Sequence, residues 1–98
     1  MTDAEYVAEL PERVSLDQNY PNPFNPATTI RYALPAADHV HLVVYDLLGS
    51  RVATLVDGRE AAGYHEVVFQ ARGLASGMYL YRLSTSSRVV TRTFTLIR

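Results

Sequence analysis

Three residue types are missing from the sequence: it contains no cysteine, no tryptophan and no lysine. Without cysteine the chain can form no disulfide, no thiolate nucleophile and no cysteine-ligated zinc site. A long hydrophobic run is missing too, since no segment approaches the ~20 apolar residues that a membrane-spanning helix needs. We therefore expect neither cysteine chemistry nor a transmembrane segment.

The sequence also has no excess of charge of one sign. Ten acidic and nine basic residues give a net charge of −1, and the basic residues, all arginine, are scattered along the chain. Nucleic acids attract proteins through clustered positive charge. The sequence therefore predicts no nucleic-acid partner.

Helical periodicity is absent, and apolar residues alternate with polar ones instead, which indicates β-strands. Together with a short piece around Leu16, the alternating segments make about seven strands, separated by turn residues at the spacing of a sandwich. We predict an all-β, immunoglobulin-like antiparallel β-sandwich with strands at 28–34, 39–45, 51–56, 64–70, 78–83 and 88–97.

Alternation also predicts which side chains face the core. One parity collects the apolar and aromatic residues of each strand, and we expect these to point inward: Ile30, Tyr32, Leu34, Val40, Leu42, Val44, His65, Val67, Phe69, Tyr79, Tyr81 and Leu83. Turns are expected at Asp46–Gly49 and at Asp57-Gly58. The spacing of Leu74, Gly77 and Tyr79 suits a tyrosine corner.

The N-terminal part divides into two stretches of different composition. Residues 1–15 are acidic with isolated apolar positions, which is typical of a linker or extension, and they lack the basic start and apolar core of a signal peptide. The domain is expected at residues 16–98. Within it, the prolines of residues 17–26 exclude a helix and predict a segment along the domain edge, anchored by Tyr20 and Phe24.

Few residues suggest catalysis or metal binding. His39 and His41 share a strand face, but Val40, Leu42 and Val44 claim the core, so both are expected in solvent without a pair of carboxylates beside them. The acids of the central region fall in or beside predicted turns, and no serine has the context of a nucleophile. We predict no enzyme, no metal site and no cofactor.

The aromatic residues leave a second function open. Ten aromatic side chains could form a carbohydrate-binding platform of a secreted glycoside hydrolase, although several have core parity. The candidates for the surface are Tyr6, Tyr20, Phe24, Tyr45 and Tyr64. A purely structural immunoglobulin-like spacer is a third possibility.

Several ordered motifs resemble a known family. They are Leu16-x-Gln18-Asn19-Tyr20-Pro21-Asn22-Pro23-Phe24-Asn25-Pro26-x-Thr28-x-Ile30, Val44-Tyr45-Asp46-Leu47-Leu48-Gly49-x-x-Val52, Gly63-x-His65-x-Val67, and Leu74-Ala75-Ser76-Gly77-Met78-Tyr79-x-Tyr81-x-Leu83. From Leu16 to Arg98 the chain resembles the type A C-terminal sorting domain of the bacterial type IX secretion system. It is also similar to the immunoglobulin-like domain of flagellar hook-capping proteins.

The resemblance implies a monomeric sorting and attachment module at the C-terminal end of a larger protein of the Bacteroidetes, which passes through the periplasm and is secreted or held at the outer cell surface. The implied partners are the outer-membrane translocon, a sortase-like peptidase acting in the N-terminal linker, and the cargo domains that precede it. Arginine replaces the lysine that the family usually has in the last strand. By position, the recognition candidates are Pro21, Asn22, Pro23, Tyr45, Asp46, Gly49, Gly77, Tyr79, Arg92 and Arg98.

Overall fold

The computed structural model describes residues 10–98, and within this range it consists of strands and turns without a helix. No helix of the described chain could therefore span a membrane. Seven strands follow one another: β1 (Ser15–Leu16), β2 (Ala27–Leu34), β3 (Asp38–Tyr45), β4 (Arg51–Glu60), β5 (Gly63–Gln70), β6 (Gly77–Ser84) and β7 (Val89–Leu96).

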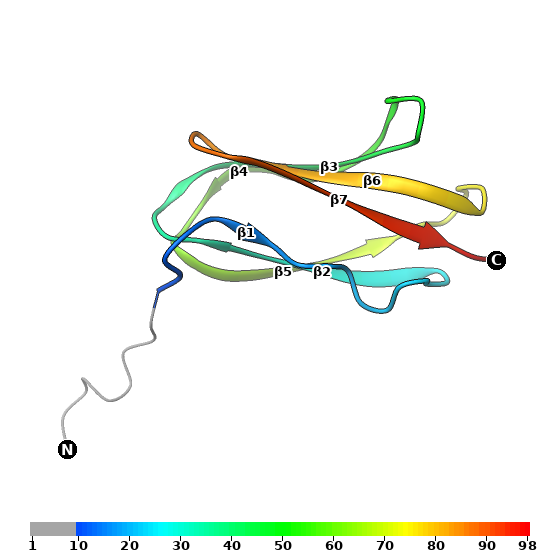
Figure 1. The fold of residues 1–98 in the computed structure, drawn as a ribbon, viewed down its shortest axis with the longest axis horizontal. Helices are drawn as coiled ribbons and strands as arrows, with labels where there is room; N and C mark the ends of the chain where they lie inside the picture. The colour runs from blue at the N-terminus through cyan, green and yellow to red at the C-terminus, as the bar shows by residue number, and fades with distance from the viewer. Residues whose placement is uncertain (1–9) are drawn as a thin grey trace, which may run out of the picture.

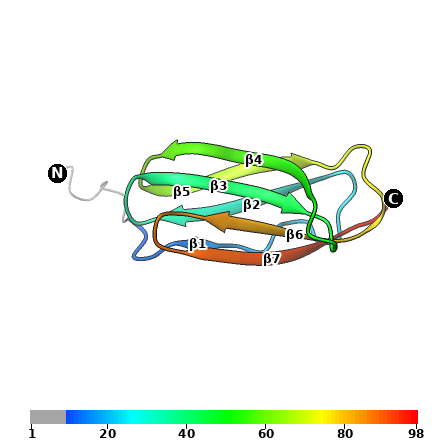
Figure 2. The same ribbon diagram turned by 90° about the horizontal axis from the view of Figure 1, so that it is seen from above.

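The strands form two antiparallel sheets that pack face to face (Figure 1). One sheet has the order β1-β2-β5 and the other the order β4-β3-β6-β7, so the chain crosses between the sheets after β2, β4 and β5. Seen from above, the strands of the two layers run nearly alongside each other (Figure 2). The predicted immunoglobulin-like β-sandwich of seven strands is confirmed.

The core lies between the sheets and follows the predicted alternation. Ile30, Leu34, Val40, Leu42 and Leu83 are all fully buried. Phe94 of β7 packs at the centre of an aromatic group, with its ring centroid 4.9 Å from that of Phe24 and 5.4 Å from that of Tyr79. The period of two therefore identified the inward faces correctly, because a strand in a sandwich has one core side.

The turn predicted at Asp57-Gly58 is wrong. Both residues lie inside β4, where Gly58 pairs with Val40 and Asp57 pairs with His41. A two-residue turn signal is local, whereas the ladder between β3 and β4 continues to Asp38 and Glu60 and satisfies the backbone of the whole segment. The chain turns after Glu60 instead.

Tyr20 and Phe24 were predicted to anchor the proline-containing segment between β1 and β2, and only Phe24 does so. Phe24 is buried, which also removes it from the surface aromatics, but Tyr20 is 81% exposed. Tyr20 points outward because it lies opposite Thr29, which faces away from the core next to the buried Ile30. Most of the expected extension at residues 1–15 lies outside the described residues, and within the described part Val14 already belongs to the core.

Candidate functional site

The segment from Asp17 to Pro26, here called the edge segment, is fixed by a buried polar network. Asn19 is 2% exposed, and its side-chain amide donates to the Pro21 carbonyl at 3.1 Å and to Thr28 Oγ1 at 3.0 Å. The Tyr81 hydroxyl accepts from the Asn19 backbone N–H at 2.8 Å and donates to the Asp17 carbonyl at 2.7 Å. Burial raises the pKa of Tyr81 above its usual range, so the hydroxyl stays protonated.

The edge segment also holds the last strand. Phe24 exchanges backbone hydrogen bonds with Thr95 and Ile97, at 3.1 and 3.0 Å, in a parallel bridge across Leu96. Asn22 Oδ1 accepts from the Thr95 backbone N–H at 2.9 Å. Pro21, Asn22 and Pro23 are thereby presented in solvent beside the end of β7, although they are more than 70 residues away from it in the sequence.

The Asp46–Gly49 turn has a defined structure. Asp46 Oδ1 accepts from the backbone N–H groups of Leu48 and Ser50, each at 2.9 Å. Gly49 has a φ of 88°, a backbone conformation that is unfavourable for residues with a Cβ. Tyr45 is half-buried before the turn, with the Arg82 guanidinium 5.2 Å from its ring centroid. The turn thus carries Leu47 and Leu48, which are 61% and 92% exposed.

Gly77 and Tyr79 confirm the predicted tyrosine corner. The Tyr79 hydroxyl donates to the Ala75 carbonyl at 2.6 Å, and its ring is buried against Phe94. Gly77 takes a φ of 148° where the chain enters β6. Tyr79 therefore shapes the turn from inside, while Gly77 lies at the surface.

Most of the candidate residues gather at one end of the sandwich. The second half of the edge segment (residues 21–26), the Asp46–Gly49 turn, the connection before β6 and the C-terminus all lie at the end opposite the first described residues (Figure 1 and Figure 2). We call this the C-terminal end. Gly77 pairs there with Leu96. The end presents four exposed apolar side chains, at Leu47, Leu48, Met78 and Ile97.

Arg92 is separate from this gathering. It lies midway along β7, opposite Tyr81, and its Nε donates to the Leu16 carbonyl. The arginine therefore bridges β7 to β1, which closes that side of the sandwich, while Arg98 follows the strand in solvent.

A sequence model described as the secretion system C-terminal sorting domain matches residues 18–97. The chain belongs to this family. It is thus a C-terminal sorting domain of type IX secretion, from a family that implies the Bacteroidetes, export to the surface or medium, and a larger cargo recognised by the secretion machinery. No curated protein and no solved structure matches it.

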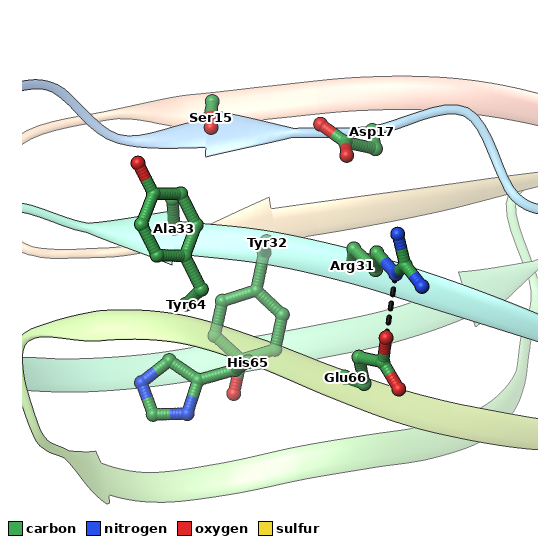
Figure 3. Close-up of a pocket in the computed structure, with 8 residues that line it drawn as sticks. All are labelled: Ser15, Asp17, Arg31, Tyr32, Ala33, Tyr64, His65 and Glu66. Carbon is green, nitrogen blue, oxygen red and sulfur yellow. Dashed lines mark hydrogen bonds and ion pairs between the residues drawn. The ribbon is translucent and has the colours of Figure 1, made fainter. Parts of the chain in front are cut away.

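The sorting domain also has a groove on the outer face of its three-stranded sheet (Figure 3). It has a volume of about 470 Å³, and Tyr64, which is 73% exposed, lines it next to an ion pair of 2.6 Å between Arg31 Nε and Glu66 Oε2. Ser15 and Asp17 line its other side from the β1 region. The groove offers one free aromatic ring and several hydrogen-bonding groups.

Beneath the groove lies the histidine that we expected in the core or at its boundary. The His65 ring stacks on Tyr32 with the centroids 5.0 Å apart, and its Nε2 donates to the Ala61 carbonyl at 2.7 Å. Burial, together with the charge and hydrogen bonding of Glu60, raises the pKa of Tyr32 to about 12. His65 is a boundary residue, 22% exposed, with one ring nitrogen hydrogen-bonded and the other 3.5 Å from Glu60 Oε1.

Two features of the sorting domain were missed at the sequence level. The partners of Asn19 could not be identified, because Tyr81 is 62 residues away. The second is Asp57, which joins His39 and His41 in solvent and had been placed in a turn. The alternation of His39 and His41 already placed two metal-ligating side chains on one strand face. The correct length of β4 would have added Asp57 opposite His41.

Proposed function

We propose that this sorting domain directs a larger protein through the periplasm to the outer surface and attaches it there, with its folded C-terminal end as the surface that the translocon reads. The observation that supports the proposal is the gathering of Pro21, Asn22, Pro23, Gly49 and Gly77 at that end, although they are distributed over the sequence. Asp46 and Tyr79 hold two of these turns in shape.

In this proposal the last strand acts as part of a folded unit. Thr95 and Ile97 bond to the edge segment, and Arg92 bonds to β1. β7 forms the edge of its sheet, but its outward backbone groups at Thr93, Thr95 and Ile97 are already bonded to the edge segment, so a receptor would meet this half of the strand as part of the folded surface. Arg98 follows the end of β7 as an exposed cationic residue.

The positions of the two chain ends support the proposed cargo and the proposed peptidase as partners (Figure 1). The described residues begin at the end opposite the C-terminal end, so cargo attached there would leave the proposed recognition surface clear (Figure 1). We place cleavage by a sortase-like peptidase in the segment before Leu16. The proposal assigns no catalytic activity to the domain, which acts as a monomer.

A reporter experiment tests the proposal. A periplasmic reporter with a signal peptide is fused in front of Met1–Arg98 and expressed in a type IX-competent bacterium and in an isogenic strain without the translocon. We expect the reporter outside the cell in the first strain and in the periplasm of the second. Equal retention in the periplasm of both strains would refute the sorting role.

The groove gives a specific reason to keep carbohydrate binding as a second candidate. Tyr64 could stack on a sugar face, with Arg31 and Glu66 bonding to its hydroxyl groups. Retention on insoluble xylan or cellulose, or a titration with soluble glycans, measures this directly, and Tyr64→Ala should abolish any signal. If a deletion of the whole domain leaves export unchanged, the chain is instead a structural spacer.

A further inference from the structure

The exposed face of the four-stranded sheet carries a compact group of metal-ligating side chains. His39 and His41 project from the same face of β3, and Asp57 projects from β4 directly opposite His41. All three side chains are about half exposed, at 54%, 49% and 58%. The positions are defined by the strand ladder, so the three groups converge without a flexible loop.

The distances between the ligand atoms fit a small divalent ion. Asp57 Oδ1 lies 2.9 Å from His41 Nε2 and 3.3 Å from His39 Nε2, and the ligand atoms all lie within 4.8 Å of one another. Zinc binds nitrogen and oxygen at ~2.0–2.2 Å, so two ligands on a tetrahedral zinc ion are about 3.3 Å apart. Small side-chain rotations would therefore place an ion among the three atoms.

We propose that His39, His41 and Asp57 form a binding site for Zn²⁺ that bridges β3 and β4, independently of the sorting function. Two imidazoles and one carboxylate favour zinc, copper and nickel over magnesium and calcium, which prefer oxygen ligands. Three protein ligands leave one position for water, which suits a site on the surface.

The charges around the site set its expected strength. Arg59 pairs with His39 across the two strands, and its guanidinium repels a cation bound there. The Asp38 carboxylate is not a fourth ligand, because it accepts from the hydroxyl and backbone N–H of Ser86 and from the backbone of His39. Removing the charge of Arg59 should therefore tighten zinc binding.

The bridge would stabilise the least buried strand of its sheet. β4 is an edge strand and its apolar residues are only partly buried, including Val52, Leu55 and Val56. An ion that binds the folded state and not the unfolded chain raises the unfolding free energy with its concentration. Zinc should thus raise the Tm and slow hydrogen exchange in β4.

Calorimetric titration of the untagged 98-residue chain with zinc chloride tests the site. We expect saturable binding at one ion per chain, at least about tenfold weaker in His41→Gln and in Asp57→Asn and tighter in Arg59→Gln. His65→Gln is the matched control, since His65 lies at the other sheet and should leave binding unchanged. Magnesium chloride should give no signal.

Two outcomes would overturn the proposal. One is an absence of saturable zinc binding below about 1 mM, or a loss in His65→Gln as large as that in His41→Gln. The other is zinc-dependent dimerisation in sedimentation, which would mean that the ion joins two chains and not two strands. Because the side chains of the site are about half exposed, thermal unfolding without zinc should show its variants folded, and the same measurement checks His65→Gln, whose side chain is 22% exposed.

Discussion

At the scale of single residues, the buried hydroxyl of Tyr81 connects β6 to the edge segment. It bonds to two backbone groups of the edge segment, 62 and 64 residues away. A buried polar group without its partner costs more free energy than a hydrogen bond contributes. Tyr81 therefore fixes the path of the segment that presents Pro21–Pro23.

Replacing Tyr81 by phenylalanine should leave the carbonyl of Asp17 and the N–H of Asn19 without this partner. We expect a loss of about 1–3 kcal/mol in the free energy of unfolding, measured by urea denaturation. Tyr64→Phe removes a hydroxyl from an exposed ring and should change stability by less than about 0.5 kcal/mol. Equal effects of the two substitutions would contradict the role of Tyr81.

The raised pKa of Tyr32 predicts how the free energy of unfolding changes at alkaline pH. Its folded-state pKa is about 12, above the ordinary value of 10.0, so the folded state holds the proton more tightly than the unfolded state. The stabilisation is complete below pH 10 and is lost as the pH rises through 12, by about 2–3 kcal/mol in total. Denaturation between pH 9 and pH 12 should show a steeper decline in the wild type than in Tyr32→Phe.

At the scale of elements, the turns depend on positive φ angles, which are unfavourable for residues other than glycine. Gly49 has a φ of 88° in the turn between β3 and β4, whereas Gly58, within β4, has no positive φ. Neither glycine has an atom within 4 Å of where a Cβ would lie, so conformation alone distinguishes them.

Gly49→Ala should therefore destabilise the domain by about 1–2 kcal/mol, and Gly58→Ala should be neutral or slightly stabilising. Thermal or urea unfolding of the two variants measures the difference. A Gly58→Ala variant that is as unstable as Gly49→Ala would show that backbone conformation is not the cause.

The elements also show what could be predicted from the sequence. Strand positions and inward faces followed from alternation, because every second residue of a strand, such as Ile30 in β2 and Leu42 in β3, faces the single core between the sheets. The turn at Asp57-Gly58 failed because the ladder to β3 outweighs a two-residue preference. Partners such as Tyr81 for Asn19, or Asp57 for His41, depend on the sandwich topology and cannot be read from local pattern.

At the scale of the whole molecule, the sandwich separates two ends. The first described residues lie at one end, and the C-terminal end collects residues 21–26 of the edge segment, two turns and the last residues of β7 (Figure 2). Such a gathering exists only in the folded domain, because the segments are far apart in the sequence. We therefore predict that the sorting signal is a folded surface.

The most direct test uses the reporter fused in front of this domain, in a type IX-competent bacterium. Leu47→Ser combined with Leu48→Ser changes exposed side chains at the C-terminal end, and Val89→Ser, with the same 61% exposure as Leu47, changes the hairpin of β6 and β7 at the opposite end. We predict that the double variant, folded by circular dichroism, loses most of its extracellular reporter, while Val89→Ser matches the wild type. Normal export of the double variant, or equal loss in both, would contradict a recognition surface at the C-terminal end.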